Sequence, residues 1–224
     1  MILNPETLIQ QIVVAIIPLI FAITLHEAAH GYAASKLGDT TALMLGRVSL
    51  NPSRHIDPIG TVIIPISLML LSGFMFGWAK PVPVNPHNLR QPRRDMALVA
   101  VAGPLANLFM AILWAGILKL TLVTAPGQYS NWAQSTLYFI QMASAFGVKI
   151  NVILMLLNLL PIPPLDGSRI VSSLLPPAAA IQYEKIEPFG FWILLGLIML
   201  NLLHYILGPL VTTTIDILTN IFNM

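Results

Sequence analysis

Long apolar runs alternate with short polar segments along most of the chain. A membrane-spanning helix needs about 20 consecutive, mostly apolar residues. Four runs meet this requirement, at residues 8–32, 96–118, 137–160 and 189–207. The pattern therefore predicts an all-α integral membrane protein with about four transmembrane helices.

A fifth apolar run, at residues 59–79, has two interpretations. It is uncharged and long enough to cross a membrane, and hydropathy alone favours an ordinary crossing helix. However, Pro65 interrupts it, and basic residues lie on both sides, in segments 31–58 and 80–95. Because Lys and Arg collect in cytoplasmic loops, we expect both flanks in the cytoplasm. We therefore predict a re-entrant segment or short hairpin that enters and leaves on the same side.

The composition agrees with a membrane location and narrows the chemistry. Hydrophobic residues make up 56% of the chain and charged residues 9%, whereas soluble domains are roughly one quarter charged. The net charge of +2 is small and the basic residues lie between apolar runs, which argues against a nucleic-acid binder. No cysteine is present, so any metal must be held by His, Asp or Glu. We therefore expect a multi-pass protein that lies in a lipid bilayer, and we expect this bilayer to be the plasma membrane of a prokaryotic cell.

Ionisable residues end the first apolar run in the stretch HEAAH, residues 26–30. His26 and His30 are four positions apart, so about 40° separates them on a helix and both imidazoles can reach one ion. Glu27 is offset by about 100°, beside that ion. Zinc enzymes use such imidazoles and a neighbouring carboxylate to activate water. The alternative is two helix-end histidines bonded to backbone or headgroups, but intramembrane ionisable residues are usually functional.

A third protein ligand is expected, because a catalytic zinc site usually has three. Of the acidic residues after HEAAH, only Asp166 directly follows a spanning run, in the stretch NLLPIPPLDGSR. The prolines stop the helix there, and Gly167 frees the backbone, so Asp166 is presented by irregular backbone at membrane depth. The alternative role of Asp166 is the N-cap of a helix that begins at Gly167.

Taken together, the two motifs resemble the site-2 protease family of intramembrane zinc metalloproteases. HEAAH matches the family's H-E-x-x-H, and NLLPIPPLDG at residues 158–167 matches N-x-x-P-x-x-x-x-D-G without a gap. AGPLAN at residues 102–107 is similar to the Gly-Pro element of the intervening helix. The resemblance covers about residues 8–169 and is to compact prokaryotic members, without an inserted PDZ domain or a CBS domain.

The resemblance implies roles for individual residues. His26, His30 and Asp166 would bind one Zn²⁺ ion, Glu27 would be the general base, and Asn158 would lie close to the active site. Asn151 is seven residues before Asn158 and shares its helix face. Support of the substrate or transition state is one use of these asparagines, and helix packing is the commoner one.

The function that we predict is that of a zinc metalloendopeptidase. It would hydrolyse peptide bonds within or near transmembrane segments of membrane-protein or peptide substrates, in regulated intramembrane proteolysis or membrane-protein turnover. The alternatives are a metal or proton transporter and a zinc-binding membrane protein without proteolysis. A transporter would show paired repeats, and a protein without proteolysis would not need Glu27. We expect one membrane-embedded domain, 1–224, with a core at 8–169 and a C-terminal helix and tail at 188–224.

The residues that must meet also constrain the topology. His30 and Asp166 can share an ion only if the first and third core helices run in the same direction, which requires that segment 59–79 does not cross. The site would then lie toward the cytoplasmic face, with both termini outside and residues 211–224 as an amphipathic tail. In segment 40–58, β-branched and apolar residues alternate around Gly46. This pattern predicts either a short β-hairpin beside the site, able to pair with an extended substrate, or an irregular interfacial loop.

Overall fold

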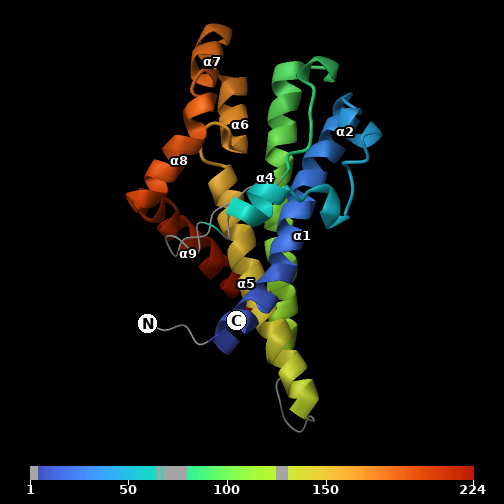
Figure 1. Cartoon of the computed structure of the whole chain (residues 1–224), viewed down its shortest axis with the longest axis vertical. Helices are drawn as coiled ribbons and strands as arrows, with labels where there is room; N and C mark the ends of the chain where they lie inside the picture. The colour runs from blue at the N-terminus through green and yellow to red at the C-terminus, as the bar shows by residue number, and fades with distance from the viewer. Residues whose placement is uncertain (1–4, 65–66, 68–79, 125–130) are drawn as a thin grey trace.

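The computed structural model describes residues 5–64, 67, 80–124 and 131–224, and these residues form helices and connecting turns without a strand. The long helices are α1 (Pro5–Leu37), α4 (Pro92–Val123), α5 (Asn131–Asn158) and α9 (Leu202–Phe222) (Figure 1). The shorter elements are α2 (Thr41–Met44), η1 (Pro52–Arg54), η2 (Pro58–Ile63), η3 (Pro86–Asn88), α6 (Asp166–Leu174), α7 (Pro177–Glu184), η4 (Glu187–Phe189) and α8 (Gly190–Met199).

Four of these helices contain stretches long and apolar enough to span a membrane. The stretches are Ile12–Leu37, Pro92–Val123, Trp132–Asn158 and Leu202–Phe222. The predicted class, an all-α protein with about four transmembrane helices, is therefore confirmed. The first three spans fall where the hydropathy of the sequence predicts them, and the chain is a multi-pass membrane protein.

The fourth span differs from the prediction of a helix over residues 189–207 followed by a tail. The chain breaks after α8, where Asn201 takes a left-handed backbone conformation with φ 57°. A new helix, α9, then continues through the residues expected to form the tail. Hydropathy averages over a single asparagine and does not detect such a break, because the left-handed conformation depends on local backbone geometry.

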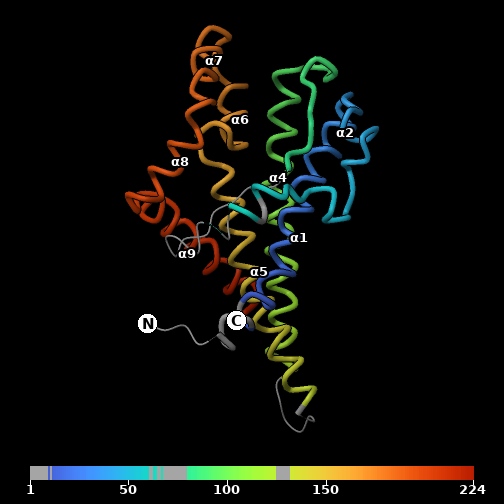
Figure 2. The backbone as a smooth tube through the Cα atoms, viewed as in Figure 1, coloured from blue at the N-terminus to red at the C-terminus, as the bar shows by residue number. Residues whose placement is uncertain are grey.

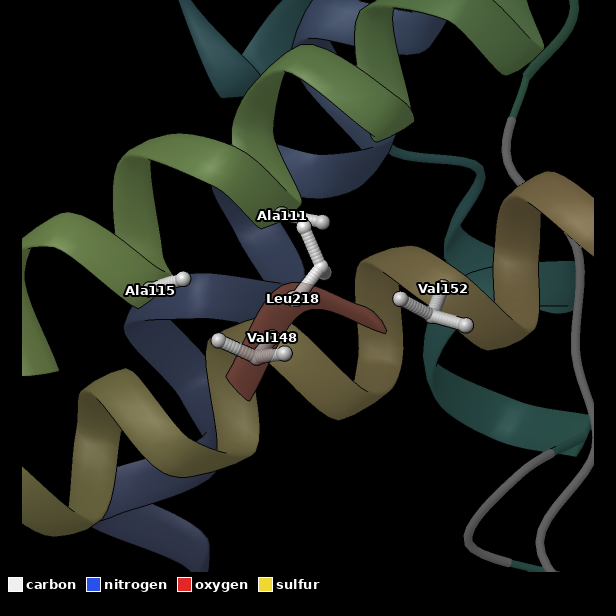
Figure 3. Close-up of a cluster of buried hydrophobic side chains, with 5 residues drawn as sticks. All are labelled: Ala111, Ala115, Val148, Val152 and Leu218. Carbon is white, nitrogen blue, oxygen red and sulfur yellow. The ribbon is translucent and has the colours of Figure 1, made fainter. Parts of the chain in front are cut away.

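The helices α1, α4 and α5 pack against one another and form the centre of the molecule. Figure 2 shows that α1 and α5 run in the same direction and α4 in the opposite one, as the convergence of the site residues requires. A buried cluster joins α9 to this bundle. It consists of Leu218 of α9 and the small or β-branched residues Ala111, Ala115, Val148 and Val152 of α4 and α5 (Figure 3). Small residues allow helix backbones to approach closely, which favours helix association in membranes.

The described chain ends that flank residues 59–79, at His55 and Lys80, lie next to each other. The backbone N–H of Lys80 donates a hydrogen bond to the carbonyl of His55 at 2.9 Å. A single crossing would separate these ends by about 30 Å. His55 and Lys80 therefore lie on the same side of the membrane. The predicted re-entrant segment itself stays a prediction, because its residues 65–66 and 68–79 lie outside the described part of the chain.

Segment 40–58 forms an irregular loop and not the β-hairpin that was one of its two predicted structures. It contains α2, a turn at Gly46 with φ +63° and the short helix η1. Asn51 caps η1 by accepting a hydrogen bond from the Ser53 N–H at 3.1 Å. Such local side-chain bonds compete with strand pairing, and Pro52 supplies no N–H for a ladder.

Asp39 ties residues 85–88 to the end of α1. Its carboxylate is fully buried and accepts hydrogen bonds from the Asn85 N–H at 2.6 Å and from Asn88 Nδ2 at 3.0 Å. It also accepts from the Thr41 N–H at 3.0 Å. Burial alone raises the pKa of Asp39, but these hydrogen bonds outweigh burial and hold the pKa below its ordinary value. These hydrogen bonds to Asp39, here called the Asp39 clamp, position the extended residues that precede η3 beside α1.

Candidate metal centre

Three ionisable side chains meet where the C-terminal half of α1 lies beside the start of α6. The Nε2 atoms of His26 and His30 are 3.0 Å apart, and each lies 3.2 Å from Asp166 Oδ2. Two ligands bound about 2.0 Å from a tetrahedral zinc ion lie about 3.3 Å apart. The structure thus brings together the three residues that the sequence selects, at the spacing that one ion requires.

The surroundings of these side chains fit a cation. His26 and His30 are buried, and Asp166 Oδ2 is buried without a hydrogen-bond partner among the described residues. A buried carboxylate oxygen without a partner is costly, and a metal ion would satisfy it. Burial alone raises the pKa of Asp166, but the two adjacent histidines lower it by more than burial raises it. The net pKa therefore lies well below its usual range. The carboxylate is therefore ionised at neutral pH, as a zinc ligand must be.

The connection between α5 and α6 turns Asp166 back toward α1. A Cβ atom at Gly167 would lie 2.3 Å from the carbonyl oxygen of Leu159 and 2.4 Å from that of Leu160. Only glycine allows α6 to begin so close to the end of α5. Asp166 is the first residue of α6, and the N-cap is Leu165, so the alternative role of Asp166 as an N-cap is wrong.

Gly103 of the AGPLAN element makes room for the two imidazoles. A Cβ atom at this position would lie 2.4 Å from His30 Nε2 and 2.6 Å from His26 Cε1. The α4 backbone therefore passes directly against the ligand atoms. The sequence offered only the family resemblance as a signal for this residue, because nothing in its hydropathy distinguishes Gly103 from other helical glycines.

The remaining nitrogen of each histidine bonds to α4. His26 Nδ1 lies 2.7 Å from Asn107 Oδ1, and His30 Nδ1 lies 2.7 Å from the Val99 carbonyl oxygen. Asn151 of α5 stands behind Asn107, with its Oδ1 3.0 Å from Asn107 Nδ2. Sequence reasoning missed Val99 and gave Asn107 no role, although Asn107 lies one helical turn after Gly103 and on the same face.

Glu27 and Asn158 have contacts of a different kind. Glu27 Oε2 accepts a hydrogen bond from the Val82 N–H at 2.8 Å, within the extended segment that Asp39 anchors. Asn158 is the last residue of α5, and its Nδ2 donates to the Leu154 carbonyl of the same helix at 2.9 Å. Their catalytic roles stay predictions.

A cleft of about 550 Å³ opens between the N-terminal end of α4 and the pair α6 and α7. On the α6 and α7 side, polar and charged side chains such as Ser168, Arg169 and Glu184 alternate with apolar ones such as Ala180 and Ile181. Met96 and Arg93 of α4 line the other side. Ser168 and Arg169 place this cleft along α6, and the residues that line it do not include His26, His30 or Asp166.

Comparisons with known proteins identify a family and several relatives. Residues 122–203 match the model of "Peptidase family M50". The chain is 39% identical over 208 residues to the Bacillus subtilis protein named "Putative zinc metalloprotease YwhC", covering 93% of this chain and 90% of that relative. The chain is 26% identical over 197 residues to the Mycolicibacterium smegmatis protein named "Putative zinc metalloprotease Rip2". This match covers 88% of this chain and 71% of that relative. No solved structure matches the chain significantly.

Proposed function

The chain belongs to peptidase family M50 and is a zinc metalloprotease, and from this premise we propose that it cleaves peptide bonds within or beside transmembrane segments of other membrane proteins. One observation carries the proposal. The three converging side chains lie among helices that are long and apolar enough to span a membrane, so they are placed for a substrate in the bilayer.

In this proposal each site residue has one task. His26, His30 and Asp166 would hold the zinc ion, which when bound would supply an activated water for hydrolysis. Glu27 would be the general base, whose carboxylate holds a proton during the reaction and gives it to the leaving amine. The Val82 N–H donates to the Glu27 carboxylate and so fixes it beside His26, one residue earlier in α1.

We further propose that the site faces the cytoplasm of a prokaryotic cell. The basic residues Arg90, Arg93 and Arg94 lie around the N-terminal end of α4, the end at which α6 packs. Lys and Arg mark cytoplasmic loops. A helical substrate must unwind locally before its peptide bond can reach the site, because neighbouring turns shield that bond.

Reconstituted protein tests the proposed activity. Purified wild-type protein in liposomes is given two peptides with one cleavable sequence, either inside a single transmembrane segment or in a soluble peptide, and products are identified by mass spectrometry. We expect cleavage of the membrane peptide, loss of cleavage with a zinc chelator, and recovery with added zinc. Glu27→Gln should keep zinc and lose at least about 100-fold in rate, because an amide cannot accept the proton. Preferred cleavage of the soluble peptide, or undiminished turnover by Glu27→Gln, would contradict the proposal.

Single cysteines test the orientation, since the natural chain has none. His87→Cys and Ser53→Cys replace exposed residues near the site, whereas Thr124→Cys replaces an exposed residue at the far end of α4. In intact cells we expect an impermeant thiol reagent to label only Thr124→Cys, with the pattern reversed in inside-out vesicles. Labelling of His87→Cys in intact cells would place the site outside.

A further inference from the structure

The Nδ1 atoms of the two site histidines have different kinds of partner. His30 Nδ1 lies 2.7 Å from the Val99 carbonyl oxygen. A carbonyl oxygen can only accept a hydrogen bond, so Nδ1 must carry the proton and Nε2 keeps its lone pair. His26 Nδ1 instead lies 2.7 Å from the side-chain amide of Asn107. An amide has a donor end and an acceptor end, so the tautomer of His26 depends on what orients Asn107.

Backbone carbonyls orient this amide. The end of Asn107 that points away from His26 lies 3.2 Å from the Ala22 carbonyl oxygen and 3.0 Å from the side chain of Asn151. Because the Ala22 oxygen can only accept, that end must be the NH₂ group. Asn151 is oriented in the same way, since its Nδ2 donates to the Gly147 carbonyl at 2.8 Å and its oxygen therefore faces Asn107.

Water cannot replace any partner in this chain of hydrogen bonds. The side chains of Asn107 and Asn151 are both 0% exposed. Reversing either amide would bring two acceptors together, and a buried polar group without a partner is strongly unfavourable. Only one arrangement of protons satisfies every group from the Gly147 carbonyl to His26. In that arrangement His26 is protonated on Nδ1, and its Nε2 lone pair points toward Asp166.

We propose that Asn107 and Asn151 are positioning residues that hold His26 in the tautomer that can bind zinc through Nε2. This inference rests on the proposed function, because it takes His26 as a zinc ligand. Asn107 bonds to His26 directly and has two orienting partners, whereas Asn151 acts only through Asn107. The loss of Asn107 should therefore weaken zinc binding more than the loss of Asn151.

Zinc affinity tests the proposal. The dissociation constant is measured in detergent by competition with a chelator. Asn107→Leu keeps the size of the side chain but removes the acceptor, and partners of metal-bound histidines typically contribute 10- to 100-fold in affinity, so we expect zinc binding about 10- to 100-fold weaker. Asn151→Leu should lose a smaller factor. The matched control is Ser144→Ala, because Ser144 is buried in α5 and its hydroxyl donates to the Ile140 carbonyl of the same helix at 2.7 Å. The zinc affinity of this variant should equal that of the wild type.

A conservative variant separates positioning from packing. Asn107→Asp keeps an oxygen for the His26 N–H, and a carboxylate is a common partner of zinc-bound histidine. The same change removes the donor to Ala22 and Asn151, so we expect zinc affinity within a few-fold of wild type and a lower thermal stability. If the two asparagines served packing alone, Asn107→Leu would bind zinc as the wild type does, and that result would overturn the proposal.

The tautomer itself is measurable without zinc. Nitrogen-15 spectra of histidine-labelled, zinc-free protein at alkaline pH should show wild-type His26 protonated on Nδ1, and a mixture of tautomers in Asn107→Leu. A wild type that neither binds zinc nor cleaves would contradict the proposed function, while the spectra would still test the asparagine pair. A wild type that binds zinc and cleaves, with the same His26 tautomer in Asn107→Leu, would refute the positioning role alone.

Discussion

The zinc-site region and the C-terminal pair α8 and α9 are both helical and apolar, yet different forces hold them in place. Around the site, fully buried Asn107 and Asn151 connect α1, α4 and α5 through side-chain hydrogen bonds. In α9, by contrast, the hydroxyls of Thr212, Thr214 and Thr219 donate to carbonyls of the same helix. Directional bonds fix the position of atoms, whereas the apolar packing of α9 fixes only its approximate place.

This difference determines how each region should respond to a change. A buried polar group that loses its partner costs about 1–3 kcal/mol and leaves a specific defect. A change on an exposed helix face usually costs less than about 0.5 kcal/mol. Substitutions near the site should therefore act on zinc binding, and those in the C-terminal pair on stability alone.

The largest expected difference between the zinc-site region and the C-terminal pair is that between two glycine substitutions, one in each region. Gly103→Ala places a Cβ atom 2.4 Å from His30 Nε2, whereas a Cβ at Gly196 of α8 meets nothing within 4 Å. We expect Gly103→Ala to lose most of its bound zinc and its protease activity, because the imidazoles must move. Gly196→Ala should match the wild type in both, as measured by metal analysis and peptide cleavage. Equal zinc contents in the two variants would mean that α4 does not pass against the ligands.

A cavity in the packing of α9 should have an intermediate effect. Leu218→Ala removes a buried side chain from the cluster that joins α9 to α4 and α5. We expect a loss of about 2–3 kcal/mol in the free energy of unfolding, toward the lower end of the range for buried leucines because a lipid environment contributes no hydrophobic transfer term. Zinc affinity should not change. A combined loss of stability and zinc affinity would show that α9 shapes the site.

The smallest expected effect is a pH dependence of stability from Asp39. Its pKa is lowered in the folded protein, so it stabilises the fold above the ordinary carboxyl pKa of about 3.9, and this stabilisation is lost as the pH falls through the folded-state pKa. Between about pH 5 and pH 3, the wild type should lose about 1–2 kcal/mol more stability than Asp39→Asn. Thermal unfolding over that range measures the difference, with Asp216→Asn in α9 as the control. Parallel pH curves for wild type and Asp39→Asn would refute the role of the clamp.

The sequence predicted the central part of the fold because hydropathy and motif spacing act there together. The spans of α1, α4 and α5 follow from apolar length, and the common direction of α1 and α5 follows from the need for His30 and Asp166 to meet. The break at Asn201 and the loop at residues 40–58 were mispredicted or left open, because local backbone conformation decides both. Gly103 and Val99 contribute through contacts between helices, which periodicity along a single helix cannot reveal.

The zinc content of purified Asp166→Ala, compared with wild type and Asp216→Ala, tests the central claim most directly. The claim is that His26, His30 and Asp166 together hold one zinc ion. The account predicts about one zinc per chain in wild type and Asp216→Ala and little in Asp166→Ala, because two histidines alone leave the ion short of a protein ligand. Equal zinc contents in all three proteins would contradict the account.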